Sequence, residues 1–181
     1  MSRLFQLLIV LFFVSSLAAS AQGIYKINTS KIKFNSDAPL EVISAQSSTV
    51  SGYLDTRKRI FSFSIPVESF QGFNSALQLQ HFREHYMQIA KYPTSSFTGK
   101  LLESFDLTKN GTYIIRAKGI LTIHGVPQER VIKSKIVVNN GIAYLNSQFT
   151  VVLADHNISI PKIAAMRLAE VITVNFKASL K

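Results

Sequence analysis

The sequence lacks cysteine altogether. This absence excludes disulfides, thiolate catalysis, cysteine-ligated zinc and a lipid-modified N-terminal cysteine. A chain of 181 residues is long enough to be held together by an apolar core alone. A secreted domain without disulfides fits a bacterial envelope compartment better than a small extracellular eukaryotic module.

Long apolar runs are also scarce, and the one that exists is short. It covers residues 4–14, follows Arg3, and is too short to span a bilayer comfortably. The small residues of Ala19-Ser20-Ala21 fit a signal-peptidase site. We therefore expect a signal peptide over residues 1–21 and cleavage near Ala21, which would place the mature chain in the periplasm or outside the cell. An uncleaved N-terminal anchor is the alternative.

Acidic residues are few, with 10 Asp and Glu against 20 Lys and Arg. Removing Arg3 leaves 19 basic and 10 acidic residues, a net charge of +9. Such a charge favours anionic partners and is compatible with a transient contact with an anionic membrane surface. The basic residues are scattered, without a stripe interleaved with stacking aromatics, so we expect no nucleic-acid partner. The oligomeric state is open, and a dimer is possible.

Two-residue alternation of apolar and polar side chains dominates the rest of the chain. It is clear in residues 60–66, 111–125 and 170–181, and it predicts antiparallel strands with one solvent-exposed and one buried face. We expect eight strands, near residues 24–34, 41–54, 59–67, 95–106, 112–124, 129–139, 142–154 and 168–180. Long antiparallel strands in up-and-down order favour a closed barrel. Residues 22–181 are therefore predicted to form a single all-β domain, an elongated eight-stranded antiparallel barrel.

Turns and one helix complete this prediction. Asn110-Gly111 and Asn140-Gly141 are strong hairpin signals, and residues 55–59 predict a looser hairpin. Residues 75–90 have an apolar stripe at three- and four-residue steps, typical of an amphipathic helix inserted between the third and fourth strands. Tyr92-Pro93 should end this helix. A second helical turn is expected near residues 162–168.

The helix carries one motif that is known from enzymes. His81, Glu84 and His85 have the H-x-x-E-H spacing of a zinc-binding helix in one class of metallopeptidases. A catalytic zinc needs a third protein ligand, and the strand-rich chain that follows offers none in a recognisable context. No nucleophile elbow, phosphate-binding loop or dinucleotide fingerprint is present. We therefore expect neither a metal nor an enzyme, and keep a zinc hydrolase as the alternative.

Several stretches in order resemble one family. Residues 91–97 contain Lys-Tyr-Pro followed by Phe97, and residues 119–126 read Gly-Ile-Leu-Thr-Ile-His-Gly-Val. These elements, together with residues 50–77 and 149–161, resemble the YceI-like family of lipocalin-like, polyisoprenoid-binding envelope proteins. The resemblance covers nearly the whole mature chain. It departs from the best-known members in its higher basic charge and in the loop around residues 155–161.

The resemblance implies a lipocalin-like barrel with a long apolar tunnel that holds an isoprenoid chain, quinone-like or polyprenyl, without any required cofactor. The expected function is carriage or storage of this lipid. The side chains expected to line the tunnel are Phe61, Phe63, Phe97, Tyr113, Ile115, Leu121, Phe149, Val151, Ile172, Val174 and Phe176. The candidates for contact with the headgroup at the mouth are His81, His85, Tyr86 and Tyr92, with Arg83 and Lys91 near a phosphate or quinone oxygen.

A filled barrel is the main alternative to a tunnel. An eight-stranded barrel either packs its interior with side chains or encloses one small ligand, and the residues alone favour neither. A filled barrel would suit a structural or stress-related interaction module.

Overall fold

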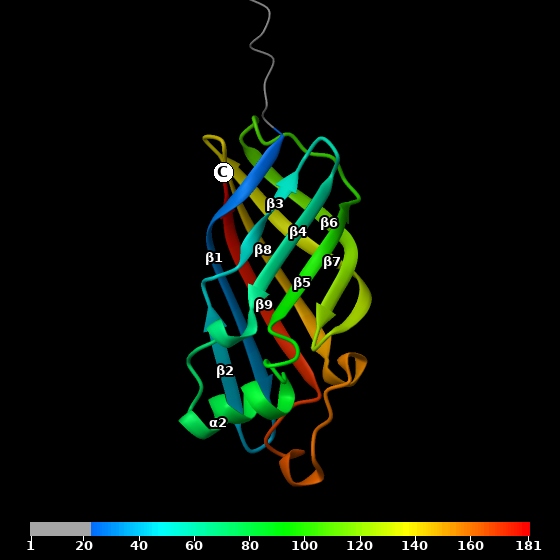
Figure 1. The fold of residues 1–181 in the computed structure, drawn as a ribbon. Helices are drawn as coiled ribbons and strands as arrows, with labels where there is room; N and C mark the ends of the chain where they lie inside the picture. The colour runs from blue at the N-terminus through cyan, green and yellow to red at the C-terminus, as the bar shows by residue number, and fades with distance from the viewer. Residues whose placement is uncertain (1–22) are drawn as a thin grey trace, which may run out of the picture.

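The computed structural model describes residues 23–181 (Figure 1). The predicted signal peptide and its cleavage site lie outside the described residues. All strands join one antiparallel sheet. They are β1 (Ile24–Asp37), β2 (Val42–Ser47), β3 (Ser51–Asp55), β4 (Ile60–Pro66), β5 (Thr94–Leu101), β6 (Gly111–Ile123), β7 (Val126–Asn139), β8 (Ile142–Val152) and β9 (Val171–Leu180).

The sheet closes into a barrel because β1 pairs on one side with β9 and on the other with β3. Strands β3 to β9 follow in chain order around the ring, so eight strands form the wall. The predicted all-β, antiparallel, eight-stranded barrel is confirmed, with β2 as a ninth strand added along the second half of β1. None of the helices formed by residues 23–181 has both the length and the apolar character needed to cross a bilayer.

The single strand predicted over residues 41–54 is two strands. Strand β2 pairs with residues 32–37 of β1, whereas β3 pairs with residues 24–26, so the chain must shift along β1 between them. Hydroxyl groups occupy this break: Ser47 Oγ lies 3.0 Å from Thr49 Oγ1 and 2.7 Å from Ser69 Oγ. Such side-chain hydrogen bonds compete with ladder pairing, which the alternation in the sequence does not reveal.

Two of the predicted hairpins are present and one is wrong. Asn140 and Gly141 both have positive φ and join β7 to β8, and residues 56–59 join β3 to β4. Asn110-Gly111 is no hairpin, because β6 runs past the end of β5 and residues 102–110 form a loop over the barrel end. Asn110 instead accepts a hydrogen bond from the Asn140 amide at 2.9 Å.

The predicted four-turn helix is shorter than expected. Helix α2 covers Ala76–His81 and begins at Ser75, whose Oγ accepts a hydrogen bond from the Gln78 amide at 3.2 Å. One π-helical segment, η3 (Phe82–Tyr86), continues it. Gln88 has φ of 46°, a left-handed conformation that ends the helical segment before Tyr92-Pro93 is reached. The second predicted helical turn is the 3₁₀ turn η5 (Lys162–Ala164).

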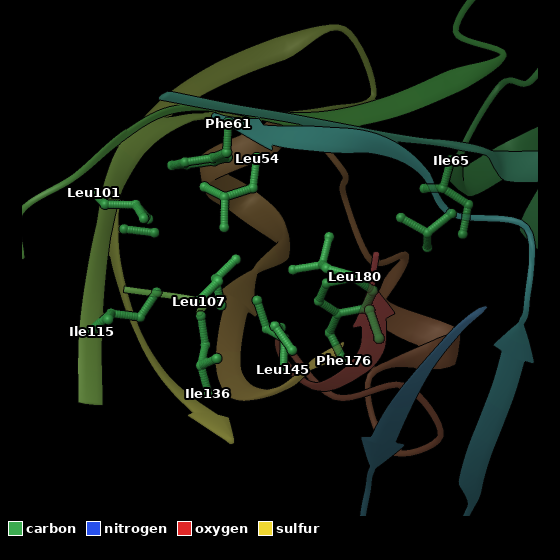
Figure 2. Packing of buried hydrophobic residues seen from close by; sticks show 14 of the residues in the cluster. Leu54, Phe61, Ile65, Leu101, Leu107, Ile115, Ile136, Leu145, Phe176 and Leu180 are labelled. Atoms are coloured by element: carbon green, nitrogen blue, oxygen red, sulfur yellow. The ribbon is translucent and has the colours of Figure 1, made fainter. Parts of the chain in front are cut away.

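The inward side chains pack tightly at one end of the barrel, which we call the filled end. Ile136, Ala143 and Leu180 are fully buried there, and Val138 is nearly so. Leu107, from the loop of residues 102–110, is 3% exposed and closes this end (Figure 2). At the opposite end the barrel is covered by α2, the turn between β1 and β2, and residues 157–170 (Figure 1).

Candidate functional site: an apolar cavity

The barrel encloses a cavity of about 580 Å³ that begins below the filled end. Leu54, Leu101, Ile115 and Leu145 form its inner limit. The cavity reaches the surface at the end covered by α2, since its lining there includes the exposed residues Leu77, His81 and Arg167. We call this part of the barrel the hollow end. A volume of this size is typical of pockets for small molecules.

Most of the side chains predicted to line a tunnel border this cavity. The alternation that predicted them is clearest in β6, where buried inward residues alternate with exposed outward ones, whereas several outward residues of β4 and β9 are half-buried. The predicted residues in the lining are Phe61, Phe63, Phe97, Ile115, Leu121, Phe149, Val151, Ile172, Val174 and Phe176. Their contact with a ligand stays a prediction.

Tyr113 lies outside the cavity lining. Its ring packs against Phe105 with a centroid distance of 5.6 Å, and its hydroxyl donates to the Lys109 carbonyl at 3.2 Å. Both partners belong to the loop that covers the filled end. Tyr113 has the predicted inward orientation, but it lies at a height of the barrel where this loop fills the space.

An aromatic cluster at the hollow end was missed from the sequence. Phe82 from η3 stacks on Phe34 of β1 with a centroid distance of 5.5 Å, and Phe73 lies 4.9 Å from Phe82. Phe70 lies 5.3 Å from Phe34. All four rings border the cavity. The apolar stripe of residues 75–90 could have identified Phe82, whereas the contacts of Phe70 and Phe73 depend on a loop that alternation does not describe.

Several polar groups in the cavity wall have hydrogen-bond partners within the protein. The hydroxyls of Ser134 on β7 and Ser147 on β8 lie 2.5 Å apart, and Ser36 Oγ accepts from the Ala169 amide at 2.8 Å. Among the described residues, the buried side-chain nitrogens without a partner belong to Arg83, His124 and His156, none of which lines the cavity. The lining is therefore mainly apolar, and the hydroxyls of Ser36, Ser134 and Ser147 within it are hydrogen-bonded.

Two of the four predicted headgroup residues lie at the cavity mouth. His81 is exposed there, and Tyr86 is half-buried. Burial raises the pKa of the Tyr86 phenol above its usual value of 10.0, so the phenol stays neutral at neutral pH. His85 is exposed but lies outside the lining, although its ring centroid is 5.2 Å from that of His81.

Tyr92 lies in a structural cluster outside the cavity. Its ring packs edge-on against His124 at 4.7 Å and so close to Gly125 that a Cβ there would clash with the ring. His124 and Gly125, both with positive φ, form a two-residue turn between β6 and β7 that the sequence interpretation placed as a strand end. These are residues of the Tyr-Pro and Ile-His-Gly motifs, whose role here is therefore to pack one segment on another.

Two buried histidines bind this turn to the next segment. His124 Nδ1 lies 3.1 Å from the His156 carbonyl oxygen, and His156 Nδ1 lies 3.0 Å from that of Val126. A carbonyl oxygen can only accept, so each Nδ1 carries the proton. The cluster therefore fixes η4 (Leu153–His156) beside the cavity wall.

Arg83 and Lys91, which were also expected near the headgroup, contact other parts of the protein instead. Arg83 donates to the Glu68 carbonyl at 2.7 Å, and the Lys91 ammonium lies 4.9 Å from the centroid of the Tyr92 ring. Neither residue borders the cavity. The early end of the helical segment at Gln88 turns Lys91 and Tyr92 away from the mouth.

Of the H-x-x-E-H residues, Glu84 and His85 lie outside the cavity lining, whereas His81 is exposed at the mouth. Glu84 is exposed and accepts hydrogen bonds from Gln80 at 3.2 and 3.3 Å. Within residues 23–181, no three His, Asp or Glu side chains stand close enough together to hold a metal ion. The helical segment switches from α to π geometry after His81, so the two histidines no longer have the spacing of a regular α-helix.

Large apolar side chains are exposed around the mouth. Leu40 is 67% exposed, Leu77 59%, Ile163 93% and Met166 53%. The Leu40 amide donates to the Met166 carbonyl at 2.9 Å, so two of the segments that carry these residues are joined. Leu77 itself belongs to the cavity lining. An apolar molecule that enters the cavity would meet this rim first.

Solved structures of the same shape come from several bacteria. A polyisoprenoid binding domain from Saccharophagus degradans, implicated in plant cell wall breakdown, is 14% identical, with a TM-score of 0.73 over 87% of this chain and 97% of that chain. BcnA from Burkholderia cenocepacia is 14% identical, with a TM-score of 0.66 over 83% and 95%. A YceI protein from Campylobacter jejuni is 18% identical, with a TM-score of 0.55 over 72% and 78%.

The family follows from the sequence itself. No curated protein matches the chain. The family model described as the YceI-like domain, however, matches residues 19–180, which include every strand of the barrel. The resemblance found in the Tyr-Pro and Ile-His-Gly motifs is thereby confirmed, and the chain belongs to the YceI-like family.

Proposed function

We propose that the protein binds one isoprenoid-type lipid, quinone-like or polyprenyl, in its apolar cavity and carries or stores it in the bacterial periplasm without covalent chemistry. The cavity of about 580 Å³ with its ring of phenylalanine, leucine, isoleucine and valine side chains is the observation that carries this proposal. The polyisoprenoid binding domain from Saccharophagus degradans, which shares the fold, supports it.

Burial provides the affinity in this proposal. Apolar surface removed from water contributes about 25 cal/mol per Å², from which the cost of association is subtracted. The inner limit of the cavity is apolar, with Leu54, Leu101, Ile115 and Leu145. The hydrocarbon tail therefore enters first, past the exposed rim, and the polar headgroup stays at the mouth beside His81 and Tyr86.

A blocking substitution tests this function. Ala117 on β6 lines the cavity, whereas Ile120 on the same strand points outward and is 41% exposed. Protein expressed in its own compartment is purified, extracted with organic solvent, and the extract is measured by mass spectrometry. We expect about one isoprenoid lipid per wild-type chain, little with Ala117→Phe and the wild-type amount with Ile120→Phe.

Two results would contradict the proposal. One is wild-type protein that contains no lipid and stays empty when it is offered polyprenyl alcohols or quinones. The other is equal lipid content in Ala117→Phe and wild type, which would place the lipid outside the barrel.

A further inference from the structure

The outer surface of strands β7, β8, β9 and β1 carries a group of closely spaced positive charges. We call it the basic wall, and define it by five exposed lysines: Lys31, Lys33, Lys133, Lys135 and Lys177. We propose that the basic wall docks the protein onto the surface of an anionic phospholipid bilayer. This inference goes beyond lipid binding in the cavity and does not depend on it.

The strand register places three of these lysines in one row. Lys135 is paired with Asn146, Asn146 with Lys177, and Lys177 with Lys31. Directly paired residues of antiparallel strands point to the same face, and neighbouring strands lie about 4.8 Å apart. The row therefore crosses four adjacent strands with three ammonium groups and one amide.

A second row lies beside the first. Gln148 is paired with Asn175, and Asn175 with Lys33. Lys133 lies two residues from Lys135 on the same face of β7, at the height of this second row. Both rows consist of lysines and side-chain amides, so their groups can donate hydrogen bonds to phosphate oxygens and none of them is acidic.

The positive charges of the basic wall are not neutralised within the described residues. The four ion pairs of residues 23–181 involve Lys109, Arg116, Lys118 and Arg130, and none involves a lysine of the wall. Lys31 stands directly opposite Lys177, and Lys133 stands opposite Arg116. Like charges at directly opposed positions destabilise a sheet. An anionic partner would offset this repulsion.

The strands on the far side of the barrel carry fewer lysines. On the far side, the outward positions of β3, β4 and β5 include the neutral residues Ser51, Tyr53, Ser62 and Thr98. Lys100 is the basic residue among the outward positions of β5. The lysines on the strand faces are therefore unevenly distributed, and their largest group is the basic wall.

A bilayer fits this surface better than a nucleic acid does. The lysines form a two-dimensional array over four strands, as lipid headgroups do, and not a single track along which a strand could run. The two rows contain no aromatic side chain on which a base could stack. Lysines near an anionic membrane surface each add favourable free energy to its binding.

Vesicle co-sedimentation tests the proposal. Full-length mature protein is mixed with vesicles of equal parts phosphatidylglycerol and phosphatidylcholine, and separately with pure phosphatidylcholine vesicles. We expect binding to the anionic vesicles, weakened by salt, and none to the neutral ones. The double variant Lys135→Glu/Lys177→Glu should bind about twenty-fold more weakly or worse, at roughly fivefold for each lysine removed.

A second double variant separates the effect of the basic wall on vesicle binding from the effect of net charge. Lys58→Glu/Lys100→Glu changes the net charge equally but lies in the β3–β4 turn and on β5, away from the wall. It should bind nearly as wild type does. Urea unfolding provides the folding control: Lys177→Glu converts the like-charged pair with Lys31 into an opposite-charged one, so the unfolding midpoint should stay or rise.

The inference is overturned if the anionic vesicles are not bound, or if both double variants weaken binding equally. It is also overturned if a soluble polyanion such as DNA is bound with the same dependence on Lys135 and Lys177 while vesicles are not. Retained folding with lost vesicle binding in Lys135→Glu/Lys177→Glu alone supports it.

Discussion

The two ends of this barrel are built by the same strands and by the same alternation, yet one is packed and the other is hollow. On β7, Ile136 at the filled end is fully buried among other side chains, whereas Ile132, four residues earlier on the same face, borders the cavity. Alternation therefore determines which side chains point inward. It does not determine whether the space between them is filled.

Small side chains and different covers account for the difference. Midway along the barrel, inward positions on three adjacent strands hold Ala117, Ser134 and Ser147, which leaves the centre open. Above them the loop of residues 102–110 inserts Leu107 into the filled end. The segments that cover the hollow end contribute rings to its wall without closing the mouth.

The largest expected difference between the two ends is in the cost of removing a core side chain. Ile136→Ala should lower the free energy of unfolding by about 2–5 kcal/mol, because it leaves a void in packed surroundings. Ile132→Ala should cost only about 1–2 kcal/mol, since its side chain already borders empty space and loses fewer contacts. Urea unfolding of both variants measures this difference, and equal losses would show that the two ends are packed alike.

Enlarging a buried side chain should also destabilise the filled end more than the hollow end, but by a smaller amount than removing one. Ala143 is fully buried at the filled end, and Ala117 lines the cavity. Ala143→Leu should destabilise the protein by about 1–3 kcal/mol through overpacking, whereas Ala117→Leu should change its stability by less than about 1 kcal/mol. Thermal unfolding monitored by circular dichroism compares the two. A larger loss of stability in Ala117→Leu than in Ala143→Leu would contradict the presence of free space at the hollow end.

The smallest expected effect concerns pH at the filled end. The Arg116 backbone amide and guanidinium both donate to the Glu103 carboxylate, at 2.6 Å each, and hold its pKa below the usual value. Because the pKa is lowered by folding, the stabilisation is present above the unfolded-state pKa and is lost as the pH falls through the folded-state pKa. Glu103→Gln should therefore lower the urea midpoint slightly at neutral pH, and the gap to wild type should narrow in acid. A gap that persists after the carboxyl is protonated would rule out this cause.

The sequence predicted the barrel and its inward faces because both depend on local periodicity. Phe63 and Phe176 could be assigned to the interior since both neighbours of each are polar. The errors concern contacts made by loops. Tyr113 has the predicted orientation but lies beneath a loop, and the positive φ of Gln88 moves Tyr92 to another cluster.

The central claim is that the hollow end holds a hydrocarbon chain, and a crystal structure of the protein loaded with a polyprenyl alcohol tests it most directly. We predict continuous density from the mouth beside His81 and Tyr86 to the aliphatic limit at Leu54 and Ile115. Density confined to the outer surface, with the inward side chains of β6 to β9 in mutual contact across the barrel, would contradict the account.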